Sequence, residues 1–426
     1  MALRLKPKMF SDFPRGNGTI GFRPKTMREV NSRDLLRLLR HHMPCSRADL
    51  VRLSGLTAPT VSAAIEALQR RGLVRFTGPG NPKGGRPPRI LEFNQQCACV
   101  LAADIGGSGV RLALADLGGN IIGTLNRLFT YRGTPDEVVA LCAEGVQSLL
   151  EENGVSRQKV LQFVAGAPGI TDVRNGTVRS APNLRGWHDI PLAEQLERQT
   201  GLPTAIENDV NLGAVGEGRC GVATAVQNFV FVAIGSGVGA GIVIDGDHFH
   251  GANWSAGEVG YMQVPGLAGE PLSLNRLGAL ETSIGGKGIR NAWLACTGGS
   301  RGTQHQRPTE IFDLAIRGDR CAVRVLETTS QHLATAIANI SLVLDTQLVV
   351  LGGGIGGHPA LVEATRKALA RNDFARPEVV AGGLGSNAQL HGAIWLAIQI
   401  AEHRGFYRQS VAHKGTRTGI KSHIAR

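Results

Sequence analysis

The sequence predicts an α/β protein in two parts, a small basic head followed by a large domain. Residues 31–70 repeat apolar side chains with the 3.6-residue period of helices. From residue 98 the composition changes to short apolar strands, glycine turns and amphipathic helices. The excess positive charge lies in the first fifth of the chain. Together these three observations separate a helical, cationic module from a larger α/β body.

Charge is distributed unevenly along the 426-residue chain. Residues 1–90 contain 18 Lys+Arg and 5 Asp+Glu, net +13, whereas residues 91–426 contain 28 and 29, net −1. A basic module on a neutral body suggests a polyanion as the partner of the head and a different partner for the large domain; the alternative is a solubilising arm. We expect residues 1–27 to form a basic disordered arm and residues 402–426 a basic disordered tail.

The sequence has no apolar run of the ~20 residues that span a bilayer, and its basic start is not followed by an apolar segment. We therefore expect a cytoplasmic protein with no membrane partner. Seven cysteines are scattered along the chain in an odd number, which predicts reduced thiols. Cys97 and Cys99 form a close pair, and packing is favoured over a zinc site because two further ligands are missing.

The head contains three predicted helices. The first is expected to begin at Asn31 or Ser32. The second is expected to begin with Ser46 and Asp49, which have the spacing of a capping box, and to end at Gly55. Short helices joined by a glycine turn are compatible with both a simple three-helix bundle and a helix-turn-helix.

The third predicted helix, residues 57–70, has one apolar and one polar face. Val61, Ile65 and Leu68 recur at i, i+4 and i+7 and are expected to face the core. The other face carries small or hydrogen-bonding side chains, which let a helix enter a major groove and place donors near base edges. The candidate DNA-contacting residues of this helix are Thr57, Pro59, Thr60, Ser62, Ala63 and Arg70.

A cationic loop, "KGGRPPRI", lies between two segments that alternate as strands, residues 73–77 and 89–93. Its prolines and glycines keep it from pairing or collapsing, so Lys83 and Arg86 are expected to reach DNA, with Arg86 in a minor groove. Three helices and this loop resemble a winged helix-turn-helix over residues 28–94. The alternative is a flexible linker with incidental charge.

The large domain contains three turns in which glycines follow an apolar strand. Their segments are "ADIGGSG", "GSGVGAGI" and "LGGGIG". Backbone amides in such turns can hold a phosphate, although one turn alone is weak evidence because many hairpins contain two glycines. The candidate nucleotide-contacting residues are Asp104, Gly106, Gly107, Ser108, Gly235, Gly237 and Gly353.

These turns occur in order with four further segments, "GAPGITD", "SAPNLRGW", "IENDVN" and "GANWSAGEVGYM". Together the segments resemble the ROK family of repressors, open reading frames and kinases, in particular its members with an N-terminal DNA-binding domain. The resemblance covers residues 30–400. It implies an actin-like and sugar-kinase-like (ribonuclease H-like) domain over residues 97–401, with two lobes around a cleft, in sugar kinases or sugar-responsive transcription factors.

The resemblance also implies a sugar site in the cleft. Carboxylates and amides suit a ring of hydroxyls, each of which both donates and accepts hydrogen bonds. In the family's kinases the carboxylate that matches Asp209 takes the proton from the sugar, while glycine turns and magnesium hold ATP. The alternative for Asp209 alone is an aspartate that caps a helix. The candidate ligand-binding residues are Asn183, Asn208, Asp209, Glu258, Tyr261 and Glu281.

One part of the family pattern is missing. The family usually has a histidine and three cysteines that bind zinc. The corresponding positions here hold Tyr261, Leu272, Leu274 and Ala279. These side chains offer no zinc site, so we predict no metal and expect apolar packing in its place. His248 and His250 form an H-x-H pair nearby, which favours a surface or core position over a metal.

The sequence therefore predicts a DNA-binding transcriptional regulator, a repressor of carbohydrate-metabolism genes, controlled by a sugar or sugar derivative and acting as a homo-oligomeric dimer or tetramer. It is not expected to be an enzyme or to hold a cofactor. The alternative is a sugar kinase with an accessory DNA-binding domain, for which ATP and magnesium are the cofactors. The lost zinc site and the N-terminal helices favour the regulator.

Overall fold

The computed structural model describes residues 24–80, 87–130, 133–182, 184–267, 272–273, 276–299 and 305–404. Four residues with sequence-predicted roles lie outside this range: Lys83, Arg86, Asn183 and Leu274. Most of the expected arm and tail also lies outside it. Residues 24–27 and 402–403 belong to helices, so the boundaries predicted for the arm and the tail are wrong at these positions.

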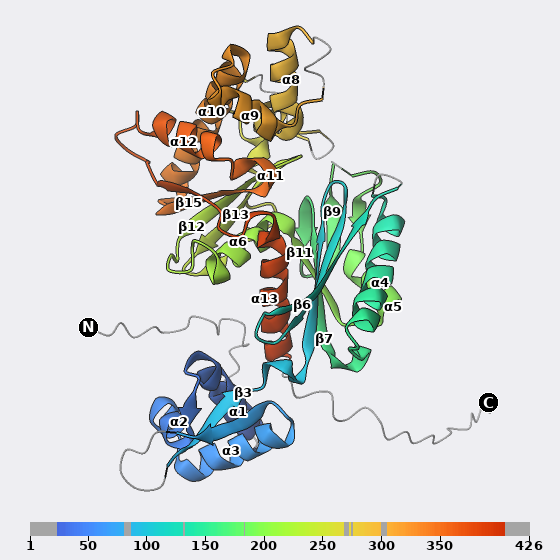
Figure 1. Ribbon diagram of the computed structural model, residues 1–426, viewed down its shortest axis with the longest axis vertical. Coiled ribbons are helices and arrows are strands. Elements are labelled where there is room, and N and C mark those ends of the chain that lie inside the picture. The colour runs from blue at the N-terminus through green and yellow to red at the C-terminus, as the bar shows by residue number, and fades with distance from the viewer. Residues whose placement is uncertain are drawn as a thin grey trace, which may run out of the picture. The chain divides into compact units, whose positions relative to one another are not determined.

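The chain divides into two units between Asn94 and Gln95. The N-terminal unit is a winged helix-turn-helix with a three-stranded antiparallel sheet in the order β1-β3-β2 (Figure 1). Its elements are α1 (Pro24–His41), β1 (Cys45–Ser46), α2 (Arg47–Ser54), α3 (Ala58–Arg70), β2 (Val74–Pro79) and β3 (Arg89–Phe93). The predicted fold class of the head is confirmed.

The head's helices follow their local sequence signals with one exception. Ser46 and Asp49 form the predicted capping box at the start of α2, and Gly55 ends this helix with a φ of 69°. The predicted start of the first helix is wrong, because α1 begins at Pro24, where a proline is tolerated in the first turn. Ser32 is consequently a buried residue within the helix.

The predicted apolar face of α3 forms the centre of the head's core. Val61, Ile65 and Leu68 have no exposed surface. They lie with fully buried side chains from α1, α2 and β3, namely Leu35, Leu39, Leu50 and Leu91. This packing fixes α3 and leaves its opposite face to solvent.

The first lobe of the large unit has a five-stranded sheet in the order β11-β7-β4-β5-β6 and a small sheet in the order β10-β9-β8. Helices α4 and α5 cover one face of the five-stranded sheet, and α13 packs on the other (Figure 1). Its elements are β4 (Cys99–Ile105), β5 (Gly109–Asp116), β6 (Ile121–Leu128), α4 (Pro135–Glu152), β7 (Val160–Ala167), β8 (Ile170–Asp172), β9 (Thr177–Ser180), β10 (His188–Ile190), α5 (Leu192–Thr200) and β11 (Thr204–Asn208).

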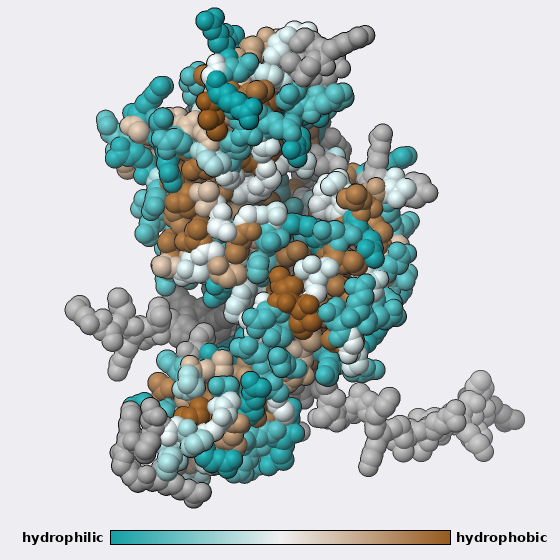
Figure 2. All heavy atoms as spheres, viewed as in Figure 1, coloured by the Kyte–Doolittle hydropathy of each residue, from teal (hydrophilic) through white to brown (hydrophobic). Residues whose placement is uncertain are grey.

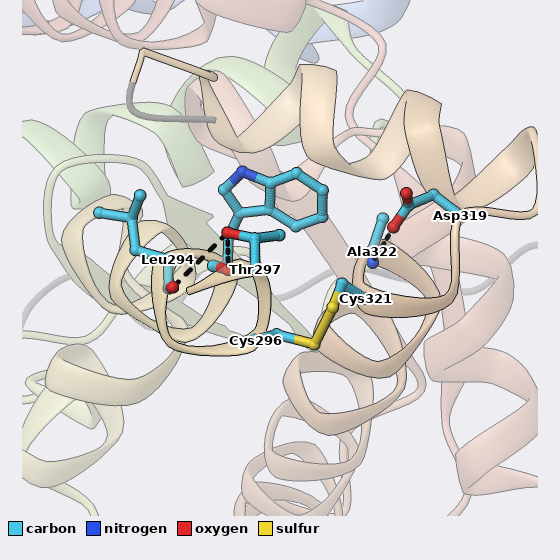
Figure 3. Close-up of a disulfide and its surroundings, with 7 residues drawn as sticks. Leu294, Cys296, Thr297, Asp319, Cys321 and Ala322 are labelled. Carbon is cyan, nitrogen blue, oxygen red and sulfur yellow. Dashed lines mark hydrogen bonds between the residues drawn. A yellow bond between two sulfur atoms is a disulfide. The ribbon is translucent and has the colours of Figure 1, made fainter. Parts of the chain in front are cut away.

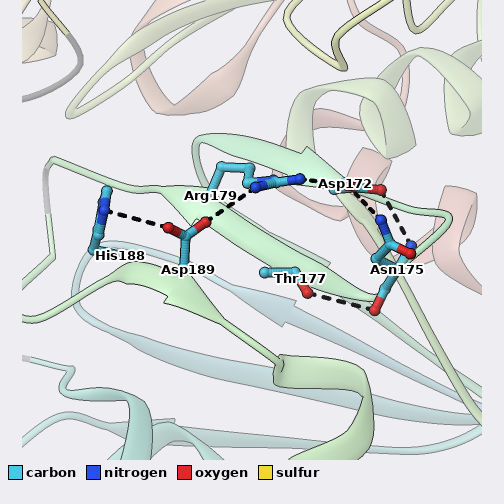
Figure 4. Close-up of polar contacts among 6 residues, drawn as sticks. All are labelled: Asp172, Asn175, Thr177, Arg179, His188 and Asp189. Atoms are coloured by element: carbon cyan, nitrogen blue, oxygen red, sulfur yellow. Dashed lines mark hydrogen bonds and ion pairs between the residues drawn. The ribbon is translucent and has the colours of Figure 1, made fainter.

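Arg179 connects the strands of the small sheet (Figure 4). Its guanidinium lies 3.1 Å from Asp172 at the end of β8 and 3.4 Å from Asp189 on β10. Asp172 also accepts hydrogen bonds from the backbone and side chain of Asn175, which shape the β8–β9 turn. Burial raises the pKa of Asp172, and these partners outweigh burial and lower it. These contacts hold the strands of the small sheet together, and β8 also contacts β11.

The second lobe has a five-stranded sheet in the order β14-β13-β12-β15-β16. Its elements are α6 (Asp209–Cys220), β12 (Phe229–Ile234), β13 (Val238–Ile244), β14 (Asp247–His248), α7 (Ala279–Ile284), α8 (Gly286–Thr297), α9 (Pro308–Ile316), α10 (Arg320–Leu344), β15 (Leu348–Gly352), α11 (Gly353–Gly356), α12 (Pro359–Leu369), β16 (Glu378–Ala381) and α13 (Ala388–His403). Short 3-10 helices are η1 (Gln95–Cys97), η2 (Arg157–Lys159), η3 (Val259–Tyr261) and η4 (Gly385–Asn387).

The two lobes repeat one topology. In each five-stranded sheet the first three strands in chain order are antiparallel and the last two are parallel additions, in the order 3-2-1-4-5. Helices α6 and α13 pack along each other between the sheets. A Cβ at Gly216 of α6 would lie 2.2 Å from the carbonyl oxygen of Ala388, so the close approach of the helices requires glycine there. The predicted two-lobed, actin-like fold is confirmed.

A disulfide in the second lobe contradicts the expectation of reduced thiols. Cys296 at the end of α8 and Cys321 at the start of α10 are bonded, with their Cα atoms 5.7 Å apart (Figure 3). Cys97 and Cys99 are free, and Cys99 is buried as expected for a packing role. The sequence did not predict the disulfide because 25 residues separate its cysteines and only helix packing brings them together.

On the face of the large unit shown in Figure 2, hydrophilic side chains surround several apolar patches. Exposed apolar side chains include Ile121, Ile122 and Leu128 of β6. Among the helices that the structure describes, none has both the length and the hydrophobicity to cross a bilayer.

Candidate functional site

A cavity of about 290 Å³ lies between the two lobes of the large unit. Its walls come from the end of β4, the start of α6, the β12–β13 turn, the segment around η3, and the starts of α7 and α11. The volume is at the lower end of the ~300–1,000 Å³ typical of small-molecule sites, so the cavity matches a ligand the size of a single sugar ring.

The three predicted glycine turns meet at this cavity, although they lie far apart in the sequence. A Cβ at Gly107 would lie 3.3 Å from Ser236 Oγ, so the first two turns are neighbours. Gly353 has a φ of 76°, and a Cβ there would lie 2.5 Å from the carbonyl oxygen of Ile234. Asp104, Gly106, Gly107, Gly235, Gly237 and Gly353 line the cavity. Ser108 is not among the lining residues of the cavity.

The described candidates for sugar contact meet at the same cavity. Asn208, Asp209, Glu258, Tyr261 and Glu281 all line it, while Asn183 lies outside the described residues. They come from the β11–α6 junction, from η3 and from α7. The structure therefore brings together residues from three separate segments, as the resemblance implied.

Asn208 has a structural role in addition to its place in the cavity wall. Its Oδ1 accepts a hydrogen bond from the backbone of Asn211 at 3.0 Å, which caps α6, and its Nδ2 donates to the carbonyl of Gly169 at 2.9 Å. The alternative that Asp209 caps the helix is wrong, because Asn208 is the N-cap and Asp209 is the first helical residue. The Asp209 carboxyl, which also lines the cavity, accepts a hydrogen bond from the backbone of Val210 at 2.9 Å.

The carboxyl groups in the cavity have shifted proton affinities. Burial and the nearby Asp104 raise the pKa of Asp209 to about 8. Burial and the nearby Glu281 raise the pKa of Glu258 to about 7. Near neutral pH these groups are therefore partly protonated and can donate as well as accept hydrogen bonds, which suits the hydroxyls of a sugar.

Several cavity residues were not identified from the sequence. Arg111 of β5 donates from Nε to Asp104 Oδ2 at 3.0 Å. Burial raises the pKa of Asp104, and Arg111 partly opposes this rise. Trp254 is part of the quoted segment "GANWSAGEVGYM" but was not singled out. Arg111 could have been found from its place on the strand opposite Asp104.

Two amide oxygens in the cavity wall also escaped the sequence analysis. Among the described residues, Asn211 Oδ1 and Gln389 Oε1 are buried and have no hydrogen-bond partner. A buried acceptor without a partner costs about 1–3 kcal/mol, so a ligand or water that donates hydrogen bonds would stabilise both. No local pattern identifies Gln389, because α13 reaches the cavity only through the tertiary fold.

The residues at the family's zinc positions do not fit a zinc ion. Tyr261 and Ala279 are partly buried and Leu272 exposes 71% of its surface, while Leu274 lies outside the described residues. The expected apolar packing is wrong for Leu272. A second cavity of about 490 Å³ lies between Tyr261, Leu272 and Ala279. Leucine and alanine have no atom that binds zinc.

The second candidate site is the outer face of α3 in the head. Thr57, Pro59, Ala63 and Arg70 are exposed, and Thr60 and Ser62 are partly exposed. The hydroxyls of Thr57 and Thr60 lie 2.8 Å apart. The other two predicted DNA contacts, Lys83 and Arg86, lie outside the described residues. Short side chains on this face allow close approach of the helix backbone to a duplex groove.

Arginine side chains of the head also pack against its aromatic rings and its carboxylates. The guanidinium of Arg89 lies 3.8 Å from the ring centroid of Phe76, and Arg47 lies 3.9 Å from Glu66 on α3. Stacking on Phe76 holds the base of the β2–β3 connection. Arg89 belongs to the stretch "KGGRPPRI" but was not among the predicted contacts.

Comparison with known proteins gives relatives of both units. The chain matches the ROK family over residues 100–400 and the IclR helix-turn-helix domain over residues 31–78. The xylose repressor of Bacillus subtilis is 26% identical over 377 residues, covering 86% of this chain and 94% of that protein. A glucokinase of Halalkalibacterium halodurans is 28% identical over 317 residues, covering 70% of this chain and 94% of that protein.

A solved structure shares the fold. It is a ROK family transcriptional regulator, described as a homologue of the E. coli MLC protein, with a TM-score of 0.74 and 23% identity. The similarity covers 89% of this chain and 97% of that one. Because the ROK family match spans more than half of the sequence, the chain belongs to the ROK family.

Proposed function

We propose that this protein is a transcriptional repressor that responds to a sugar. One observation carries the proposal: a single chain joins a winged helix-turn-helix, with a small and polar exposed helix face, to a cleft lined by carboxyls. The similar xylose repressor spans both units, whereas the similar glucokinase covers a smaller share of this chain. The controlled genes are those of carbohydrate metabolism.

The head binds double-stranded DNA through α3. Its N-terminal turn and outer face enter a major groove, and the cationic loop between β2 and β3 lies in the neighbouring minor groove. The chains act as a symmetric pair, so that two heads contact two half-sites of an operator. Most of the affinity comes from phosphate contacts of the basic head, while Thr60 and Ser62 contribute to the choice of operator.

The cleft binds the sugar through its acids and amides. Asp209, Glu258 and Glu281 donate to or accept from ring hydroxyls, and the free oxygens of Asn211 and Gln389 accept from them. Contacts to both lobes favour a closed arrangement, which changes the geometry of the paired heads. The sugar controls DNA binding only as far as it binds the two arrangements differently, typically by about 1–3 kcal/mol.

The kinase alternative depends on Asp209 as a base. Burial and the nearby Asp104 raise the pKa of Asp209 to about 8, close to the pH at which a general base works best, so its proton affinity is compatible with this role. Asp104 is already paired with Arg111. The glycine turns and acids nevertheless have the arrangement that the alternative requires, so activity must be measured.

The direct test is fluorescence anisotropy with a labelled duplex from the protein's own promoter region, at low salt, with and without D-xylose or D-glucose. We expect sequence-specific binding that a sugar changes by about 5–150-fold. Absence of specific binding to any duplex from this region would contradict the proposal.

A parallel assay measures ATP consumption with a panel of hexoses and pentoses. If the protein is a regulator, the wild type should consume ATP no faster than the Asp209→Asn variant. Turnover that this substitution abolishes would instead support the kinase alternative.

A further inference from the structure

Two histidines of the second lobe converge on one buried carboxylate next to the cleft. His248 ends β14, His250 follows it, and Glu207 lies on β11 of the first lobe, 43 residues before His250. The Nε2 atoms of His248 and His250 lie 3.3 and 2.8 Å from Glu207 Oε2. Within the described part of the chain, one ligand atom from each of these residues lies within 4.8 Å of the other two.

These distances match those between ligands of one metal ion. Zinc binds imidazole nitrogen and carboxylate oxygen at about 2.0–2.1 Å, so two such ligands lie about 3.3 Å apart at a tetrahedral angle and about 2.9 Å apart at a right angle. The two histidine–glutamate separations agree with these values. Both histidine nitrogens therefore lie at ligand-like distances from the same carboxylate oxygen.

The carboxylate is already oriented for this role. Glu207 Oε1 accepts hydrogen bonds from the backbone of Asn208 at 2.9 Å and from Asn211 Nδ2 at 3.1 Å, which leaves Oε2 directed to the histidines. Outer hydrogen bonds that fix a ligand are a regular feature of metal centres. The amide of Asn211 also lines the cavity, so it connects this cluster to the cleft.

The surroundings allow an ion to enter. The side chain of Glu207 is only 3% exposed, whereas those of His248 and His250 are 22% and 23% exposed. An ion would thus have a buried anion on one side and solvent on the other, where water can complete its coordination. The ring of His250 also lies 5.1 Å from that of Trp254, a cavity residue.

We propose that Glu207, His248 and His250 bind a divalent transition-metal ion, Zn²⁺ in the first instance. Two imidazoles and a carboxylate suit Zn²⁺ better than the oxygen-seeking Mg²⁺ or Ca²⁺. The site is distinct from the family's zinc positions around Tyr261. From the sequence alone, a surface or core position was favoured over a metal site for His248 and His250, because their contact with Glu207 was not predicted. The ion would join β11 of one lobe to the loop after β14 of the other.

The test compares metal uptake by the chelator-treated full chain and by a double variant, His248→Gln with His250→Gln. Glutamine keeps a hydrogen-bond donor for Glu207 but is a poor zinc ligand. The matched control is His358→Gln, because His358 pairs with a single carboxylate, Asp313, at 3.3 Å. Equilibrium dialysis followed by elemental analysis measures the bound Zn²⁺.

We expect one Zn²⁺ per chain in the wild type and in His358→Gln, and at least a tenfold loss of affinity in the double variant. Equal uptake by the double variant, or no uptake by the wild type, would overturn the proposal. If the double variant fails to fold, the visible absorption spectrum of the wild type loaded with Co²⁺ distinguishes this site from a cysteine site. Nitrogen and oxygen ligands give visible bands without thiolate charge transfer, and a thiolate band would place the metal on cysteine instead.

Discussion

The head and the cleft use opposite electrostatics. The head has a net positive charge, and its helix α3 exposes short polar side chains such as Thr60 and Ser62. The cleft is lined by carboxyl groups and by the amide oxygens of Asn211 and Gln389, which have no hydrogen-bond partner among the described residues. The pKa values of Asp209 and Glu258 are raised there, so these two groups hold their protons more tightly than usual. A head with net positive charge suits a large polyanion, whereas enclosed acids suit a small neutral polyol. The contrast explains how one chain serves two different partners.

The largest expected effect is that a substitution in the core of the head destabilises that unit and leaves the large unit intact. Ile65 is fully buried in the head, so Ile65→Ala should destabilise that unit by about 2–5 kcal/mol. DNA binding should be lost while sugar binding is retained, because the cleft lies wholly in the other unit. Anisotropy and thermal unfolding measure both, with Ile316→Ala, at a position 66% exposed, as the control. Equal loss of sugar binding would show that the units are not independent.

The next effect is the pH dependence of the free energy of unfolding, to which Glu258 in the cleft contributes. Glu258 releases its proton near its ordinary pKa of 4.5 when unfolded and at a pKa of about 7 when folded. The folded state therefore binds more protons between these values, and its stability falls as pH rises through this window. Glu258→Gln should flatten this dependence by up to about 1.4 kcal/mol per pH unit. Denaturant unfolding at about pH 5 and about pH 7 measures the slope.

The matched control for this pH effect is Glu152→Gln, at an exposed position on α4. It should leave the pH dependence of unfolding unchanged. An unaltered slope in Glu258→Gln would contradict the raised proton affinity of the cleft.

A smaller effect tests the exposed face of the head. Ala63→Glu places an anion on the outer face of α3, where it would meet phosphates or base edges. We expect DNA affinity to fall at least tenfold, about 1.4 kcal/mol, while stability changes by no more than about 0.5 kcal/mol. Gln96→Glu adds the same charge to the large unit and serves as control. If both variants bind equally well, α3 is not the DNA-contacting helix.

The smallest effect is on salt dependence. Lys83→Ala with Arg86→Ala should reduce the slope of log affinity against log salt by about 2, because each phosphate contact contributes about 0.9. The comparison is Arg371→Ala with Arg376→Ala, which removes the same charge from the large unit. A slope equal to that of the wild type would exclude the loop from the DNA interface.

Local patterns predicted the head well because its helices depend on neighbours in sequence. The capping pair at Ser46 and the apolar period through Ile65 each act within one or two turns. The predicted start of α1 was wrong because no strong stop signal separates Pro24 from the predicted cap at Asn31 or Ser32. Periodicity alone does not locate a helix start when the preceding residues also tolerate helix.

The cleft was predicted through ordered motifs rather than through local pattern. Family resemblance identified acids such as Asp209, whereas two contacts that only the fold supplies were missed: the place of Gln389 in the cavity wall and the convergence of His248 and His250 on Glu207. The bond between Cys296 and Cys321 was missed for the same reason. Such contacts join residues far apart in sequence, so they follow from packing of whole elements.

The central claim is that sugar binding in the cleft and DNA binding by the head are coupled. The most direct measurement is the Kd for sugar in the presence and absence of saturating operator duplex, together with the Kd for the duplex with and without saturating sugar. Linkage requires the two ratios to be equal, and we expect each to lie between about 5 and about 150. Binding of both partners with ratios of one would contradict the claim.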